Sequence, residues 1–200
     1  MQPIGPKMPV RAMALLAVFA AALASEGSAQ AFERSFCSWC HGESGQGYAS
    51  APRLAGQTSQ YIENQLRSFH AHARAGPLMW GATTGFSVQS AHDIAIYFSA
   101  ISPKAADDGD AELVPAGRSI FQDGDPDSDV VACAPCHGPA AEGAGEVPRL
   151  GGLSYYYVQA RLEHWRQGHH TGAPPPMPRI ASQLSSSEIK ALASYLSSMK

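Results

Sequence analysis

The chain has 200 residues, of which 44% are hydrophobic and 16% charged, and its formal net charge is -3. This length and apolar content are sufficient for one domain of ordinary size or two small ones. Because there is no excess of basic residues, the composition argues against a nucleic-acid-binding protein.

The first 31 residues are predicted to be a signal peptide. Lys7 and Arg11 precede an uninterrupted apolar run at residues 12–24, and a small-residue cleavage site follows at residues 29–31. The apolar run is shorter than the about 20 residues that a spanning helix needs. We therefore expect export to the periplasm and cleavage near Phe32, with retention as an uncleaved membrane anchor as the alternative.

All four cysteines belong to two copies of one motif. Cys37-Ser38-Trp39-Cys40-His41 returns as Cys133-Ala134-Pro135-Cys136-His137. Cys-x-x-Cys-His is the attachment signature of c-type haem, in which two thiols bond to the porphyrin and the histidine reaches the iron. The sequence therefore predicts two covalently bound haem c groups with a shared ligand pattern. The predicted attachment residues are Cys37, Cys40, Cys133 and Cys136, and the predicted proximal iron ligands are His41 and His137.

Three other uses of four cysteines remain as alternatives: two disulfides, a thioredoxin-like redox pair or a structural zinc site. A thioredoxin-like pair follows a strand, and neither copy of the motif is preceded by a Val/Ile-rich run. A zinc site would leave the longer repeat around the motif without an explanation.

That longer repeat indicates an internal duplication. An offset of 96 residues pairs Pro52-Arg53-Leu54 with Pro148-Arg149-Leu150 and Tyr61 with Tyr157, and an offset of 98 pairs Met79 with Met177. The repeat predicts four segments: a signal peptide at residues 1–31, an N-terminal domain at 32–102, a linker at 103–110 and a C-terminal domain at 111–200.

Each copy is predicted to be helical. Apolar residues recur at helical spacing from Tyr61 to Phe69 and from Tyr157 to Trp165, and again near the end of each copy. Ser185 and Glu188 have the spacing of a capping box, which predicts where the last helix begins. Since a unit of about 70 residues is small for a hydrophobic core of its own, we expect each haem to complete a core.

An acidic stretch joins the two copies. Residues 102–132 contain eight acidic side chains against Lys104 and Arg118, a formal charge of -6. Residues 112–121 are predicted to form the first helix of the second domain. The remainder is interpreted as a solvated connector, with electrostatic docking of a partner as the alternative.

The second axial ligand separates an electron carrier from a catalyst, because a haem with an open position can bind oxygen or peroxide. Met79 and Met177 occupy equivalent repeat positions in loops rich in Pro and Gly, and are predicted to be these ligands. Histidines are the competing ligands, and bis-histidine ligation would lower the potential. At the offset of 96, His70 pairs with Arg166 and His72 with Gly168, so neither recurs in the other copy. The remaining histidines are His70, His72, His92, His164, His169 and His170.

The repeated Pro-Arg pair is expected to support the haem. The main-chain carbonyl of Pro52 or Pro148 is predicted to accept a hydrogen bond from the proximal imidazole and fix its tautomer. Arg53 and Arg149 are expected either to contact haem propionates or to lie on the surface. Trp39 and Pro135, inside the two motifs, are expected to fill space at the porphyrin edge.

These residues together resemble the dihaem cytochrome c4 family. Cys37-x-x-Cys40-His41-Gly42 with Pro52-Arg53-Leu54-Ala55-Gly56, and the matching second set, carry the resemblance across nearly the whole chain after residue 31. The resemblance implies an all-α fold of two tandem class I cytochrome c domains, each wrapped around one covalent haem. It also implies a periplasmic electron carrier with possible peripheral membrane association.

By this resemblance, the expected partners are redox proteins: a membrane quinol-oxidising complex or a dehydrogenase as donor, and a terminal oxidase or reductase as acceptor. No nucleic-acid partner and no enzymatic activity are expected. Two alternatives are kept. One is the cytochrome subunit of a sulfide- or thiosulfate-oxidising dehydrogenase, and the other is a dihaem peroxidase, which the matched methionines disfavour.

Overall fold

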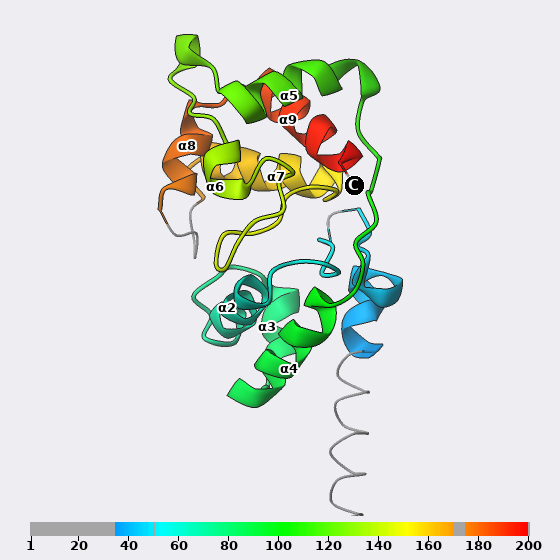
Figure 1. Ribbon diagram of the computed structural model, residues 1–200. Helices are drawn as coiled ribbons and strands as arrows, with labels where there is room; N and C mark the ends of the chain where they lie inside the picture. The colour runs from blue at the N-terminus through cyan, green and yellow to red at the C-terminus, as the bar shows by residue number, and fades with distance from the viewer. Residues whose placement is uncertain (1–34, 50, 170–174, 200) are drawn as a thin grey trace, which may run out of the picture.

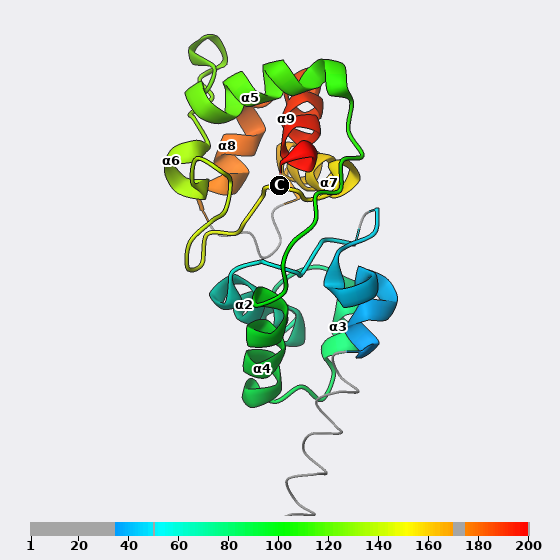
Figure 2. The same ribbon diagram turned by 45° about the vertical axis from the view of Figure 1, so that its right-hand side comes forward.

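The computed structural model describes residues 35–49, 51–169 and 175–199. The predicted signal peptide and His170 lie outside these residues. Within the described part the chain has helices and isolated β-bridges but no strand. The helices form two groups stacked end to end, joined by one extended stretch of chain along their side (Figures 1 and 2).

The first group carries the first copy of the repeat. Residues 35–41 are helical, and η1 (Glu43–Gly45), α2 (Ser59–His70), α3 (Pro77–Thr83) and α4 (Val88–Ser99) follow. Helix α2 begins where Thr58 accepts a hydrogen bond from the Tyr61 N–H, and it buries Ile62, Leu66 and Phe69 on one face. It packs against both α3 and α4.

The second group repeats this plan with an added helix. It comprises η2 (Ala111–Leu113), α5 (Val114–Asp123), η3 (Pro126–Ser128), α6 (Ala134–His137), α7 (Tyr155–Arg166), α8 (Met177–Gln183) and α9 (Ser186–Ser198). Helices α5 and α9 pack against each other at Gly117. A Cβ at this position would fall 2.0 Å from the Ala191 carbonyl oxygen of α9. Only glycine permits this approach.

Most of the helix predictions are confirmed. The amphipathic segments form α2 and α7, residues 112–121 fall in η2 and α5, and the capping box of Ser185 and Glu188 opens α9. The prediction that the two methionines lie in loops is wrong. Met79 lies inside α3 and Met177 is the first residue of α8, because Pro77 and Pro178 sit in the first turns, where a missing N–H costs nothing.

Each group has its own hydrophobic core. Ile62, Leu66, Ile94 and Phe98 belong to the first core, and no residue of the second group is part of it. The second core is larger because α5 adds Phe121 to the contribution of α7 and α9. The two cores are therefore separate, as two tandem units require.

The acidic connector follows the second group closely. The Asp107 N–H donates to the Ser197 carbonyl at 2.9 Å, and the Asp110 N–H donates to Ser194 Oγ at 3.1 Å. Asp108 accepts from Ser154 Oγ and from the Tyr155 N–H, both at 2.7 Å, at the beginning of α7. The interpretation of a solvated connector is therefore wrong for Asp108, whose carboxylate accepts hydrogen bonds at the beginning of α7, whereas Asp110 is exposed.

Arg53 joins the two groups. Its side chain is buried at 3% exposure, and its guanidinium donates to the carbonyls of Ala55 (3.1 Å), Lys104 (2.6 Å), Gly152 (2.8 Å) and Gly151 (2.5 Å). Burial, with Arg149 as a smaller cause, lowers its pKa to about 10. The surface alternative is thus wrong for Arg53. Because main-chain carbonyls of both groups and the connector occupy its donors, Arg53 fixes their relative position.

Further hydrogen bonds reinforce this junction. Gln57 donates to the Arg149 carbonyl at 2.9 Å and accepts from the Arg149 N–H at 2.7 Å. Thr58 Oγ1 donates to the Gly145 carbonyl at 2.6 Å, and Asn64 donates to Glu146 at 2.9 Å. Side chains of the first group thus pair mainly with loop backbone of the second.

We expect Arg53→Gln to lower the free energy of unfolding by about 3 kcal/mol, because glutamine leaves several buried carbonyls without a donor. Chemical denaturation of the haem-loaded protein, followed by far-UV circular dichroism, measures the change. Arg118→Gln, on the exposed side of α5, is the control and should change stability by less than about 0.5 kcal/mol. Equal effects of the two substitutions would contradict the role given to Arg53.

Candidate haem sites

The two Cys-x-x-Cys-His motifs occupy equivalent helical positions. The first lies in the helix at residues 35–41 and the second in α6 and the residue before it. Both histidines are buried, His41 at 8% exposure and His137 at 5%. Each motif therefore presents its imidazole to the interior of its own group.

The loop after each motif fixes the imidazole. His41 Nδ1 lies 2.7 Å from the Pro52 carbonyl oxygen, and His137 Nδ1 lies 3.0 Å from that of Pro148. These are the contacts that the repeat predicts. Since a carbonyl only accepts, Nδ1 carries the proton, and Nε2 is the nitrogen with a lone pair for a metal.

The protonation state of the imidazoles suits metal binding. Burial lowers the pKa of His41 and of His137, and the hydrogen bonds to the proline carbonyls oppose this shift. A neutral imidazole is the form that binds iron. Burial, with a smaller contribution from Cys136, also raises the pKa of the Cys133 thiol to about 11.

The cysteines show neither disulfide nor zinc geometry. No disulfide joins the four, all of which lie in the described part of the chain. Across residues 35–49, 51–169 and 175–199, no group of three or more His, Cys, Asp or Glu side chains is placed to hold a metal ion. The two competing uses of the cysteines therefore lack support.

Each group brings one motif cysteine and one predicted methionine to the same core. Cys37 and Met79 pack against the first core, and Cys133 and Met177 pack against the second. In each group, a motif cysteine and the repeated methionine thus contact the same small set of buried apolar residues.

The competing histidines have other contacts and are exposed. His70 Nδ1 lies 2.9 Å from the Thr83 carbonyl, His72 stacks on Trp80 with ring centroids 4.7 Å apart, and His92 pairs with Glu63 at 3.0 Å. The rings of His164 and His169 lie 5.9 Å apart.

Comparison with known proteins agrees with this arrangement. The family model Cytochrome c matches residues 24–97 and 114–200, one segment for each copy of the repeat. A cytochrome c4 of Thiocapsa roseopersicina is 37% identical, and the match covers 80% of this chain and 85% of that protein. The crystal structure of reduced recombinant cytochrome c4 from Pseudomonas stutzeri has a TM-score of 0.79 at 30% identity, and the match covers 86% of this chain and 98% of that one.

This chain belongs to the dihaem cytochrome c4 family. It has two tandem class I cytochrome c domains and carries two covalent haem c groups, so it is a dihaem electron-transfer cytochrome. A thiosulfate dehydrogenase electron acceptor of Thiomonas intermedia is also similar, at 35% identity over 96% of this chain and 91% of that protein.

The residues around the cores of this cytochrome fit haem carboxylates. Arg74 Nε and Trp165 Nε1 are buried hydrogen-bond donors without a protein acceptor. A buried donor left without an acceptor is costly, and haem c offers two carboxylates. Trp39 is 73% exposed to solvent and packs against Phe36 with ring centroids 5.3 Å apart, and its expected place at the porphyrin edge stays a prediction.

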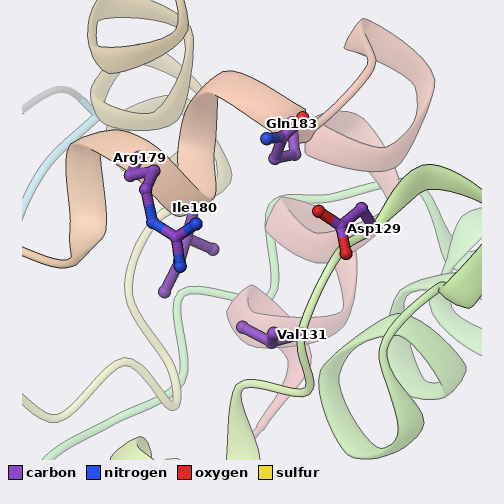
Figure 3. A pocket seen from close by; sticks show the side chains of 5 residues that line it. All are labelled: Asp129, Val131, Arg179, Ile180 and Gln183. Carbon is purple, nitrogen blue, oxygen red and sulfur yellow. The ribbon is translucent and has the colours of Figure 1, made fainter.

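A small pocket lies beside α8. Asp129 and Val131 line it from the stretch before Cys133, and Arg179, Ile180 and Gln183 line it from α8 (Figure 3). None of these five residues is a motif cysteine, a motif histidine or one of the two repeated methionines.

The residues at the junction were not identified from the sequence. Gln57, Arg74 and Arg161 contact the other domain or lie beside residues that do. The repeat replaces them with Leu153, Gly172 and Gln65 respectively. Polar residues that break the internal repeat were the available signal, because a contact between two unlike domain faces requires different residues on each.

We expect Cys37→Ala combined with Cys40→Ala to yield a protein with one haem, because the cores are separate and each attaches its own group. Mass spectrometry and a pyridine haemochromogen assay count the haems. The reciprocal variant, Cys133→Ala with Cys136→Ala, is the control and should also retain one. Loss of both haems from either variant would show that the two sites are not independent.

Proposed function

We propose that this cytochrome is a periplasmic electron carrier in which both haem irons have a histidine and a methionine ligand. The ligands are His41 and Met79 in the first domain and His137 and Met177 in the second. The carrier performs no bond-making on a metabolite. Its donor is a membrane quinol-oxidising complex or a dehydrogenase, and its acceptor is a terminal oxidase or reductase.

The observation that carries this proposal is the matched placement of Cys37 with Met79 and of Cys133 with Met177. In each domain the motif cysteine and the methionine pack on one core, and the motif histidine is held by a proline carbonyl. Two axial ligands leave no position for oxygen or peroxide, which favours electron transfer over peroxidase chemistry.

The haem supplies the redox couple, and the chain sets the conditions around it. Pro52 and Pro148 orient the imidazoles, and their carbonyls increase the basicity of the ring. The apolar cores exclude water from the space between histidine and methionine. The helices α3 and α8 hold the thioether side chains in place, so little rearrangement accompanies a change of charge.

We include the domain limits in the proposal: a signal peptide at residues 1–31, domains at 32–102 and 111–200, and a linker at 103–110. The connection between α4 and η2, which makes main-chain contacts with both domains, supports these limits. In the described part, every helix is too short or too polar to span a bilayer. Peripheral membrane association remains part of the proposal.

We expect Met79→Leu and Met177→Leu each to remove about half of the sulfur-to-iron charge-transfer band and to lower the potential of one haem, because one iron loses its thioether. Redox-titrated absorption and EPR spectroscopy on the periplasmically expressed protein measure both effects. Met199→Leu, which changes a partly buried methionine of no proposed ligand role, should leave the band intact. Bis-imidazole spectra of both domains in the parent protein would refute the ligand set.

A second candidate function is that of the electron-accepting cytochrome of a thiosulfate-oxidising dehydrogenase. Its support is the similarity to the Thiomonas intermedia protein, whose name gives it that role and which matches nearly the full length. In that case the electron would enter from a bound catalytic partner and not from the quinol pool. The dihaem architecture serves both roles, since each needs only rapid one-electron transfer.

The rate at which each candidate donor reduces the haems of this cytochrome distinguishes the two functions. If the dehydrogenase role is correct, a purified thiosulfate dehydrogenase with thiosulfate should reduce both haems within the mixing time of a stopped-flow experiment, while a quinol-oxidising membrane fraction should do so far more slowly. Cytochrome incubated with thiosulfate alone is the control. Fast reduction by the membrane fraction only would assign the chain to respiratory transfer.

A further inference from the structure

The junction between the domains contains two tyrosines and two arginines. Tyr61 lies on α2, Tyr157 and Arg161 lie on α7, and Arg74 lies in the segment between α2 and α3. Arg74 is buried at 8% exposure, and no ion pair of the described residues includes either arginine. No carboxylate in the described part of the chain neutralises Arg74, and its Nε is the donor that fits a haem carboxylate, so the contacts of its other guanidinium nitrogens show what else this residue holds.

Arg74 contacts both domains through its guanidinium. One nitrogen donates to Gln65 of its own domain, and the other donates to Tyr157 Oη of the second domain at 3.3 Å. The guanidinium also lies over the Phe69 ring, 4.6 Å from its centroid. Burial, followed by the neighbouring Tyr157, raises the pKa of Tyr61 to about 12, so the Tyr61 phenol beside Arg74 stays neutral.

The main chain of Arg74 is tied to the helix that carries Met79. Its carbonyl accepts a hydrogen bond from Trp80 Nε1 at 2.7 Å, and Trp80 directly follows Met79 in α3. The Arg74 N–H donates to the Ser68 carbonyl of α2 at 3.1 Å. The segment also packs tightly against α2 at Gly76, where a Cβ would lie 2.8 Å from the Phe69 ring.

The second domain offers no arginine in the equivalent place. The offset that pairs Met79 with Met177 pairs Arg74 with Gly172. The arginine link between Tyr157 of the second domain and the Met79 segment of the first therefore has no repeated counterpart at the second haem.

We infer that Arg74 is a positioning residue for Met79, which makes the sulfur–iron bond of the first haem dependent on contact with Tyr157 of the second domain. The inference rests on the proposed ligand role of Met79. When the contact is lost, the segment between α2 and α3 gains freedom, and an external ligand displaces the thioether from the first iron more easily. The second haem keeps its Met177 bond.

Imidazole binding to the ferric, haem-loaded protein tests this inference. Imidazole replaces the thioether at the iron without any redox step, and loss of the charge-transfer band reports it. In a Met177→Leu background the remaining band belongs to Met79 alone. There, Arg74→Gln should lower the imidazole Kd by about tenfold, the size expected for the loss of a hydrogen bond to a charged group.

Tyr157→Phe provides a second, milder variant, because it removes only the Oη acceptor and retains the ring. It should lower the same Kd in the same direction. Arg67→Gln is the matched control, since Arg67 lies on α2 of the same domain in a half-exposed pair with Glu63, and it should leave the Kd unchanged. In a Met79→Leu background, where Met177 supplies the band, all three substitutions should have no effect.

An unchanged Kd in Tyr157→Phe, or an equal decrease at both haems, would overturn the inference. If Arg74→Gln fails to retain its haems, Tyr157→Phe alone decides. A parent protein whose Met177→Leu background shows no charge-transfer band would instead overturn the proposed ligand role of Met79, so the two failures are distinguishable.

Discussion

The guanidinium of Arg53 is the contact on which the arrangement of the two domains depends. It is buried, and four main-chain carbonyls from the first domain, the connector and the second domain accept its hydrogen bonds. A charged donor with several buried acceptors gains its strength from the low local dielectric, which also makes its removal costly. The interface contacts of Gln57 and Arg74 lie at the same junction and add to this contact.

Within each domain, a hydrogen bond between a proline carbonyl and the motif histidine orients the imidazole. A glycine-rich loop after the motif returns the chain so that the Pro52 or Pro148 carbonyl meets the proximal imidazole, at 2.7 and 3.0 Å. Both domains have this contact at the same separation of eleven residues, so it depends on short-range chain geometry. The domains differ where they meet. Gln57 and Arg74 of the first domain donate hydrogen bonds, and a loop carbonyl and Tyr157 Oη of the second domain accept them. Two similar sites therefore have unlike surroundings, which is a physical basis for two different potentials.

Predictions from local sequence succeeded where the determining forces are local. Helix α2 followed from apolar spacing, α9 from the capping box of Ser185 and Glu188, and the histidine–proline contact from an identical separation of eleven residues in both copies. The assignment of Met79 and Met177 to loops was wrong because Pro and Gly were taken as breakers, although Pro favours a first helical turn. Asp108 was interpreted as solvated because its partners, Ser154 and the Tyr155 N–H, lie more than forty residues away.

The sequence by itself determined the number of haems, their attachment chemistry and the helical character of each repeat, since motif spacing and periodicity are properties of neighbouring residues. Only the tertiary structure decided that Arg53 is an interdomain contact and that Arg74 lies between Tyr157 and the Met79 helix. An arginine has the same local appearance on a surface and in an interface. The carbonyls and phenols that distinguish the two come from distant parts of the chain, and folding alone brings them together.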